Sequence, residues 1–180
     1  MIKINFEDIF EPLEIGVDLM DLKFYSVLKN GAQVLLKVEI RSLEDPLLPN
    51  VFNLAFGPLN TQAKIDDMIK LNHLKSGKVF STILLFALSF LQKNKSANIG
   101  VDGSNDARAY LYHRMFFTNK EYLSEFLIPI GVDWYVRMLR DGTVEKDPDG
   151  FIFFKPKPEP LDYKRSMKDL YRYYMFYLIQ

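Results

Sequence analysis

The sequence predicts an α+β fold: a mixed, mostly antiparallel sheet with a buried central helix. Three observations predict it. An Asn-Gly pair at 30–31 separates two stretches rich in apolar and β-branched residues, Val79–Leu91 is apolar almost all round, and strand and helix patterns alternate after it. The 180 residues are 48% hydrophobic, which is enough for a sizeable core. We therefore expect a single domain spanning residues 1–180.

The first part of the chain is predicted to be strands. Phe24–Lys29 and Ala32–Ile40 flank the Asn-Gly pair, which tolerates the positive φ angles of a two-residue hairpin turn. Val51–Phe56 is a third strand, because Gly and Pro follow it directly. Asp66–Asn72 is expected to form a helical turn or a short helix.

The middle of the chain predicts a helix, a strand and a second helix. An apolar helix such as Val79–Leu91 must be covered on most sides. Ala97–Val101 reads as a short strand, followed by a turn rich in N-cap residues. Ala107–Phe117 is the second helix, and the residues expected on one of its faces are Ala107, Leu111 and Met115.

The last third gives weaker patterns. Tyr122–Val132 is expected to be an edge strand, since it contains Pro129. Phe151–Lys155 reads as a strand, and the three prolines of 156–160 predict a stiff connector. Leu161–Gln180 is expected to form an aromatic-rich helix that packs on the body of the domain or on a second copy. The predicted parts are an N-terminal segment 1–21, a core 22–155, and the connector and helix 156–180.

Composition excludes several kinds of protein. Without cysteine there is no disulfide framework and no thiolate zinc site, and His73 and His113 lack metal-ligand spacing. Lys and Arg together equal Asp and Glu at 23, so a nucleic-acid partner is not expected. The longest apolar stretch is too short for a membrane span, and the acidic N-terminus is no signal peptide. We expect a cytoplasmic protein.

Two short segments carry a family resemblance. The first helix opens with Ser76-Gly77-Lys78-Val79-Phe80-Ser81, and the second helix region has Asn105, Leu111, Tyr112 and Phe117 at set intervals. The middle of the chain thereby resembles the GNAT superfamily of N-acetyltransferases. That family has R/Q-x-x-G-x-G/A at its first helix, and many members have N-x-x-A-x-x-L-Y-x-x-x-G-F at the second.

The resemblance implies a coenzyme site. In the family, backbone N–H groups at the first helix bind the pyrophosphate of acetyl-coenzyme A, which by position assigns Gly77, Lys78 and Ser81 to the cofactor. Asn105 would lie near the cofactor, and Tyr112 would protonate the leaving thiolate. Val79 and Ser81 stand where the family has glycines, so the resemblance also implies a degenerate site. Tyr112 read without the family is a helix tyrosine of the core.

A narrower resemblance covers Gly103 to Tyr112. This segment is similar to a G-S-x-x-x-R-x-x-L-Y stretch in small uncharacterised bacterial proteins, which implies a bacterial source; those proteins carry no assigned activity to transfer.

Three functions stay open. The first is an acetyltransferase-shaped domain without acetyl transfer and without a cofactor, acting through protein contacts or another ligand. The second is an acyl-coenzyme A-dependent N-acyltransferase that uses acetyl-coenzyme A. The third is an unrelated α+β binding protein. The replaced glycines favour the first. A protein partner or a homodimer is expected to contact the predicted helix 161–180.

Overall fold

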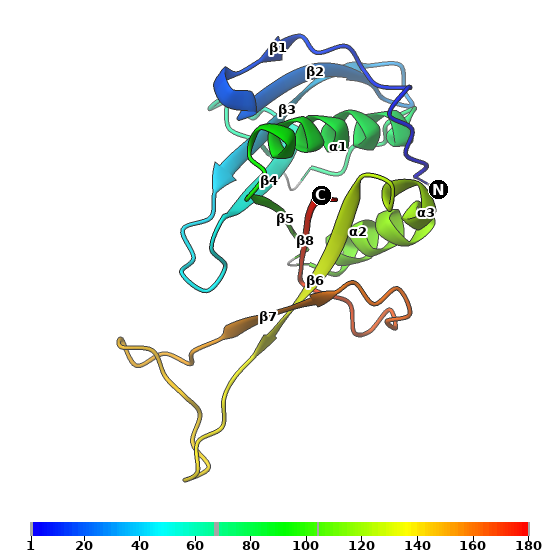
Figure 1. Ribbon diagram of the computed structural model, residues 1–180. Coiled ribbons are helices and arrows are strands. Elements are labelled where there is room, and N and C mark those ends of the chain that lie inside the picture. The colour runs from blue at the N-terminus through cyan, green and yellow to red at the C-terminus, as the bar shows by residue number, and fades with distance from the viewer. Residues whose placement is uncertain (1, 67–68, 104, 180) are drawn as a thin grey trace.

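The computed structural model describes residues 2–66, 69–103 and 105–179, and within these ranges eight strands form one sheet. The strand order is β1-β2-β3-β4-β5-β8-β6-β7, and the only parallel pair in that sheet is β4 with β5. Figure 1 shows α1 across one face of the sheet, with α2 and α3 beside its other end. The predicted α+β class with a mostly antiparallel sheet and a buried central helix is confirmed.

The elements have the following bounds. The strands are β1 Glu14–Ile15, β2 Asp21–Val27, β3 Gln33–Ser42, β4 Val51–Pro58, β5 Asn98–Asp102, β6 Leu127–Tyr135, β7 Lys155–Pro160 and β8 Tyr173–Leu178. The helices are the 3-10 turn η1 Val17–Leu19 and the α-helices α1 Ser76–Lys93, α2 Asp106–Thr118 and α3 Lys120–Leu123.

The predicted hairpin is confirmed as β2 and β3, although its turn is longer than expected. Leu28 N–H donates to Ala32 O, so the connection has three residues, and of these Gly31 alone has a positive φ, at 85°. Asn30 instead accepts a bond from Ala32 N–H through its side chain. A three-residue loop with glycine at the left-handed position is the next common hairpin type.

The core lies between α1 and the inner face of the sheet. Alternate residues of β3 (Leu36, Val38 and Ile40) are buried and face the helix, as strand alternation requires. Burying each such side chain contributes roughly 1.5–3 kcal/mol. The predicted buried helix is therefore confirmed, and its buried residues are Val79, Phe80, Ser81, Thr82, Ile83, Leu84, Phe86, Ala87, Leu88, Phe90 and Leu91.

The predicted C-terminal helix 161–180 is wrong. The described part of this segment forms a loop and then strand β8, which pairs with both β5 and β6. Its Tyr174 and Phe176 are fully buried against α2, with Phe116 stacked on Tyr174 at 6.2 Å between ring centroids. Aromatic residues favour a half-buried strand, and here tertiary packing overrides the helical reading. The predicted dimer surface on that helix disappears with it.

The predicted elements around β6 and β7 shift along the chain. Residues 122–132 contain the end of α3 and the start of β6, and β6 lies between two strands instead of at an edge. Pro129 is tolerated because β7 pairs only from Ile130 onward, and the carbonyl of Pro129 accepts a bond from Leu161 N–H. A strand is predicted at Phe151–Lys155, but β7 begins at Lys155, the last residue of that range.

Strand β7 runs through the prolines that predicted a connector. Pro156, Pro158 and Pro160 pair opposite β6, yet proline cannot donate to a ladder. The ladder N–H groups of β7 must therefore belong to Lys155, Lys157 and Glu159, and the prolines turn their nitrogen atoms toward the open edge.

Two smaller predictions also change. The described residues of the range 66–72 are not helical, and residues 67 and 68 lie outside the described residues, as does Ser104 of the Gly-Ser segment. Helix α2 is confirmed, but its buried side is rotated from the expected Ala107–Leu111–Met115 face, and Ala107 is exposed. The buried residues are Ala109, Tyr112, His113, Met115 and Phe116.

A charged cluster joins the loop before β8 to Asp133 of β6 and Glu159 of β7. Tyr171 is fully buried; its hydroxyl donates to Glu159 at 2.8 Å, and the Arg165 guanidinium lies 3.6 Å from its ring centroid. Arg165 also pairs with Asp133 on β6. Burial, and then the hydrogen bond to Glu159, raise the pKa of Tyr171 to about 12. Gly131 makes room for this ring, since an added Cβ would lie 2.3 Å from it.

We expect Gly131→Ala to destabilise the protein by about 1–3 kcal/mol, as overpacking of a rigid core does. Urea unfolding followed by circular dichroism measures the loss. The double variant Gly131→Ala with Tyr171→Leu should lose less than the sum of the two single variants, because the smaller side chain removes the clash. Strictly additive losses would show that the ring does not press on residue 131.

His113 lies buried between α2 and the same loop. Its Nδ1 has no hydrogen-bond partner among the described residues. Burial lowers the pKa of His113, while a hydrogen bond to the Tyr163 backbone and the charge of Asp162 oppose this and Arg165 adds to it. Burial lowers the pKa of His73 too.

These two histidines predict acid sensitivity. An unfolded histidine binds a proton below about pH 6.5, whereas the folded state resists it, so the stability present above that pH falls as the pH falls toward the folded pKa. Unfolding free energies from urea titrations at neutral and mildly acidic pH measure the slope. His113→Gln and His73→Gln should each flatten it. An unchanged slope in both variants would assign the acid loss to other groups.

Candidate functional site

The first turns of α1 carry three of the residues that the GNAT resemblance assigns to a coenzyme, and the N-terminal segment crosses them. We call residues 2–10 the strap; Figure 1 shows the blue end of the chain passing the N-terminal end of α1. An added Cβ at Gly77 would lie 2.5 Å from the carbonyl oxygen of Lys3. Gly77 therefore allows a close backbone approach, and the approaching group is the strap.

Two hydroxyl groups on α1 bind the strap. Ser81 Oγ accepts a hydrogen bond from Asn5 N–H, and Thr82 Oγ1 accepts one from Phe10 N–H, each at 2.9 Å. Both hydroxyl side chains are buried. Each bond contributes about 1 kcal/mol net, and each satisfies a strap N–H that no strand partner serves.

The strap is also bound from the side of α2 and α3. Asn119 Oδ1 accepts from Ile4 N–H at 2.8 Å, and the Tyr122 hydroxyl accepts from Phe6 N–H at 3.1 Å. The strap thus bridges α1 to the end of α2, two elements that approach each other around the inner face of the sheet.

Lys78 completes the contact with a charge pair. Its Nζ lies 2.8 Å from Asp8 Oδ1 and 5.0 Å from the ring centroid of Phe10. The hydrogen bond from Lys78 lowers the pKa of Asp8. The cation that would have served a pyrophosphate is therefore engaged by a carboxylate of the same chain.

The parallel strands β4 and β5 separate close to this end of α1. Their pairing covers Val51 to Asn53 against Asn98 to Gly100, whereas β4 continues to Pro58 and β5 to Asp102. Two parallel strands joined through a helix place their carboxyl ends at that helix's N-terminus. This is where a ligand could enter between them.

Large side chains fill the space between the separating strands. Phe56 of β4 meets Phe80 of α1 edge-on at 5.6 Å between centroids, and Tyr112 of α2 closes the other side. The remaining cavity is about 10 Å³, at most one water molecule. The side chains that line it are Leu54, Phe56, Phe80, Ile83, Leu84, Val101, Tyr112, Met115, Phe116 and Phe176.

Tyr112 and Asn105 occupy different settings. Tyr112 is only 7% exposed and packs its ring 6.1 Å from that of Tyr174, so it belongs to the core beside the filled space. Asn105 caps α2: its Oδ1 accepts a hydrogen bond from Arg108 N–H at 3.0 Å. The structure brings Gly77, Lys78 and Ser81 together under the strap, with Tyr112 in the neighbouring core and Asn105 at the start of α2.

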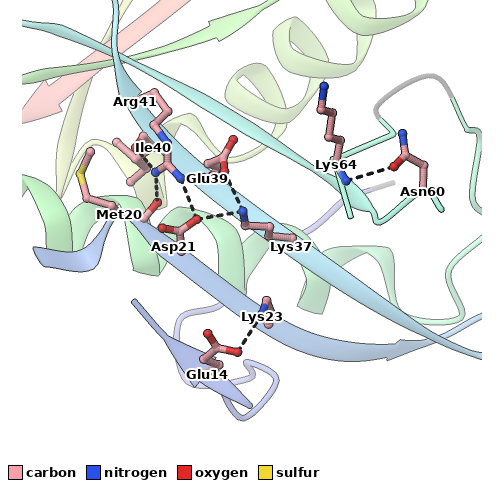
Figure 2. Close-up of polar contacts among 10 residues, drawn as sticks. All are labelled: Glu14, Met20, Asp21, Lys23, Lys37, Glu39, Ile40, Arg41, Asn60 and Lys64. Atoms are coloured by element: carbon pink, nitrogen blue, oxygen red, sulfur yellow. Dashed lines mark hydrogen bonds and ion pairs between the residues drawn. The ribbon is translucent and has the colours of Figure 1, made fainter. Parts of the chain in front are cut away.

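A second cluster of charges covers the outer face of β2 and β3. Figure 2 shows Asp21 between Lys37 and Arg41, both of which also reach Glu39. Partial burial opposes ionisation of Asp21, but the hydrogen bonds from Arg41 and Lys37 prevail and lower its pKa. Acids and bases pair with one another here, so this face carries no excess charge that would attract a charged ligand.

Other features give no stronger candidate. A shallow hollow of about 400 Å³ beside α2 is lined by Ile2, Tyr110, Leu111, Arg114 and Met115. Within the described residues, no group of three His, Asp or Glu side chains could hold a metal ion. None of the described helices is long and apolar enough to cross a membrane.

Sequence reasoning missed the strap residues Asn5, Asp8 and Phe10. One signal was present: the first 22 residues carry six acids against Lys3 alone, which anticipates a basic partner such as Lys78. Hydrogen bonds between residues 76 positions apart leave no local pattern in a sequence.

Comparisons with known proteins give one family. Residues 12–135 match a family described as a family of unknown function (DUF6934). The match begins after the strap and ends at the last residue of β6, so β7 and β8 lie beyond it. No curated protein and no solved structure matches the chain.

We expect Gly77→Ala to displace the strap, because the added methyl group would overlap the Lys3 carbonyl oxygen. With about 1 kcal/mol lost per broken hydrogen bond, amide exchange at Asn5 and Phe10 should accelerate roughly fivefold while that of α1 stays protected. Hydrogen exchange followed by NMR measures both. Ser76→Ala, in the same turn, is the matched control and should leave the strap amides slow. Equal exchange in the two variants would contradict the close approach at Gly77.

Proposed function

This chain belongs to the DUF6934 family of unknown function, and we propose that it is an acetyltransferase-shaped domain that binds no coenzyme A and acts through protein contacts. The resemblance to small bacterial proteins and the cysteine-free sequence support a bacterial, cytoplasmic setting for this role.

One observation carries the proposal: the strap contacts the residues at the start of α1 that would otherwise bind a pyrophosphate. The carbonyl of Lys3 lies against Gly77. Asp8 pairs with Lys78, and Asn5 N–H donates a hydrogen bond to Ser81. A pyrophosphate would have to replace a carboxylate and a backbone segment at once. Four strap hydrogen bonds of about 1 kcal/mol each oppose that exchange.

The filled space between β4 and β5 supports the same conclusion. An acyl chain with a pantetheine-like arm needs a channel, and a residual cavity of about 10 Å³ offers none. Val79, which stands where the GNAT superfamily has a glycine, is itself buried in the core. Opening a channel would require Phe80 or Tyr112 to leave the core, at about 3–5 kcal/mol for each aromatic side chain lost from it.

A second candidate function, an acyl-coenzyme A-dependent N-acyltransferase, draws support from the divergence of the parallel strands β4 and β5. In that function the strap would move aside, Gly77, Lys78 and Ser81 would bind pyrophosphate, and Tyr112 would protonate the thiolate. The unrelated binding protein remains a third candidate without an observation of its own.

Thermal unfolding with acetyl-coenzyme A tests the proposal. A ligand at 100 times its Kd adds about 2.7 kcal/mol, which raises the Tm of a chain this size by roughly 5–10 °C. We expect no rise at millimolar acetyl-coenzyme A beyond that caused by sodium pyrophosphate, the control for bulk anion effects. A rise of several degrees specific to the coenzyme would overturn the proposal.

The same measurement on Asp8→Asn with Tyr122→Phe, which removes two strap contacts and keeps Gly77, Lys78 and Ser81, separates the two barriers. This variant weakens the strap but leaves Phe80 and Tyr112 in place, so we again expect no coenzyme effect. A rise seen only in the variant would favour an acyltransferase whose site the strap covers.

A further inference from the structure

A forked arm projects from the sheet between β6 and β7. We call residues 136–154 the arm; Figure 1 shows it extending away from the helices as two branches at the far end of β6 and β7. The first branch is a hairpin around Gly142 and the second a hairpin around Gly150, both glycines having positive φ. Met138 bridges Val144 in the first branch.

The two branches share their middle segment. Glu145 N–H donates to Arg137 O, and Phe153 N–H donates to Glu145 O, so residue 145 joins both hairpins. Lys146 bridges Ile152 in the second branch. Because side chains alternate along each segment, Met138, Val144, Lys146 and Ile152 share one face, and Arg137 and Glu145 share the other.

The two faces differ in character. On one face Glu145 pairs with both Arg137 (3.0 Å) and Lys155 (2.7 Å), and Lys155 lies 4.9 Å from the ring centroid of Phe153. The hydrogen bond from Lys155 lowers the pKa of Glu145. These charges neutralise one another, and the exposed Leu139 and Phe151, which alternation places on this face, add apolar surface to it.

The opposite face is exposed and mostly apolar, although the exposed Lys146 lies on it as well. Met138 is 73% exposed, Ile152 48% and Phe154 56%, and Phe154 follows Ile152 on the same face by alternation. Trp134, 41% exposed, extends this surface toward Val132 on the same face of β6. Within the described chain, neither buried cluster includes Trp134 or these arm residues. Soluble monomers seldom expose so many large apolar side chains on one short segment.

We propose that the apolar face of the arm is the surface on which a second copy of this chain packs, forming a two-fold dimer. The proposal rests on the proposed function, since it names the protein contact through which the domain acts. A two-fold interface is self-complementary, so the exposed apolar side chains of this arm would meet those of the same arm in the partner.

The charge of the arm permits a second copy to approach and gives a strongly charged partner no advantage. The arm and Lys155 together carry four bases and four acids: Arg137, Arg140, Lys146 and Lys155 against Asp141, Glu145, Asp147 and Asp149. Two such arms do not repel each other, and this balance attracts neither nucleic acid nor a strongly charged protein. Strand addition is excluded at the neighbouring edge, because Pro156, Pro158 and Pro160 leave it without N–H donors.

The available area is that of a stable dimer. Trp134 and Phe154 each expose about half of a side-chain surface of 150–250 Å², and with Met138, Ile152 and the half-buried Val144 they offer roughly 500 Å² of apolar area. Homodimer interfaces are about 65% apolar, so this corresponds to about 800 Å² for each partner, the usual size of a specific interface.

Sedimentation equilibrium on the full chain tests the proposal. We expect the wild-type protein to reach twice the 21.1 kDa chain mass at micromolar concentrations. The variant Met138→Glu with Phe154→Glu should weaken association about 100-fold or more, because like charges would face each other across the two-fold axis. Val17→Glu, at an 84% exposed position near the other edge of the sheet, is the matched control and should remain dimeric.

Cross-linking gives an independent readout. The chain has no cysteine, so Ile152→Cys introduces a unique thiol, and a short bis-maleimide should join two copies. Val17→Cys should stay uncrosslinked. A monomeric wild-type chain, or a dimer that survives both glutamates, would overturn the proposal. Circular dichroism confirms that each variant folds. The acetyl-coenzyme A measurement does not depend on association, so either proposal can fail without the other.

Discussion

Strand β8 is the connection on which the whole sheet depends. It pairs with β5 on one side and β6 on the other, although these strands are separated by two helices in the sequence. Its alternate aromatic residues Tyr174 and Phe176 bury themselves against α2. Without β8, the strands β2 to β5 with α1 would be one unit, and β6 with β7 a separate two-stranded ribbon, which is marginally stable alone. The position of the arm follows from the same pairing.

Local chemistry made half of this fold predictable. The hairpin, α1, β5 and α2 carry their own signals: glycine at a turn, an apolar run, and Asn105 as an N-cap. Strand β8 has no such signal, because its aromatic residues suit either a helix buried all round or a strand inside a sheet. The choice between helix and strand depends on the position between β5 and β6, where a strand can pair on both sides. The prolines of 156–160 predicted a connector instead of a strand for a related reason: proline is acceptable in a strand whose other edge is open.

The candidate site was predictable in its residues and not in their use. Gly77 stood out because glycine permits a close backbone approach, and the structure uses that permission for the carbonyl of Lys3. Ser81 and Lys78 likewise have the chemistry to bind an anion, yet they contact Asn5 and Asp8. Tyr112 follows its reading as a core residue. The partners lie about 70 residues away in the chain, so composition and spacing alone could not have named them.

The prolines of β7 also limit how this protein can aggregate. An open sheet edge is a template on which further chains can add as strands, the first step toward fibres. At one end of this sheet every second residue lacks the required N–H, and at the other end β1 is only two residues long. Growth of the sheet from molecule to molecule is therefore obstructed at both ends. The exposed apolar side chains of the arm therefore lie beside a sheet edge that cannot extend their contacts from molecule to molecule by strand addition.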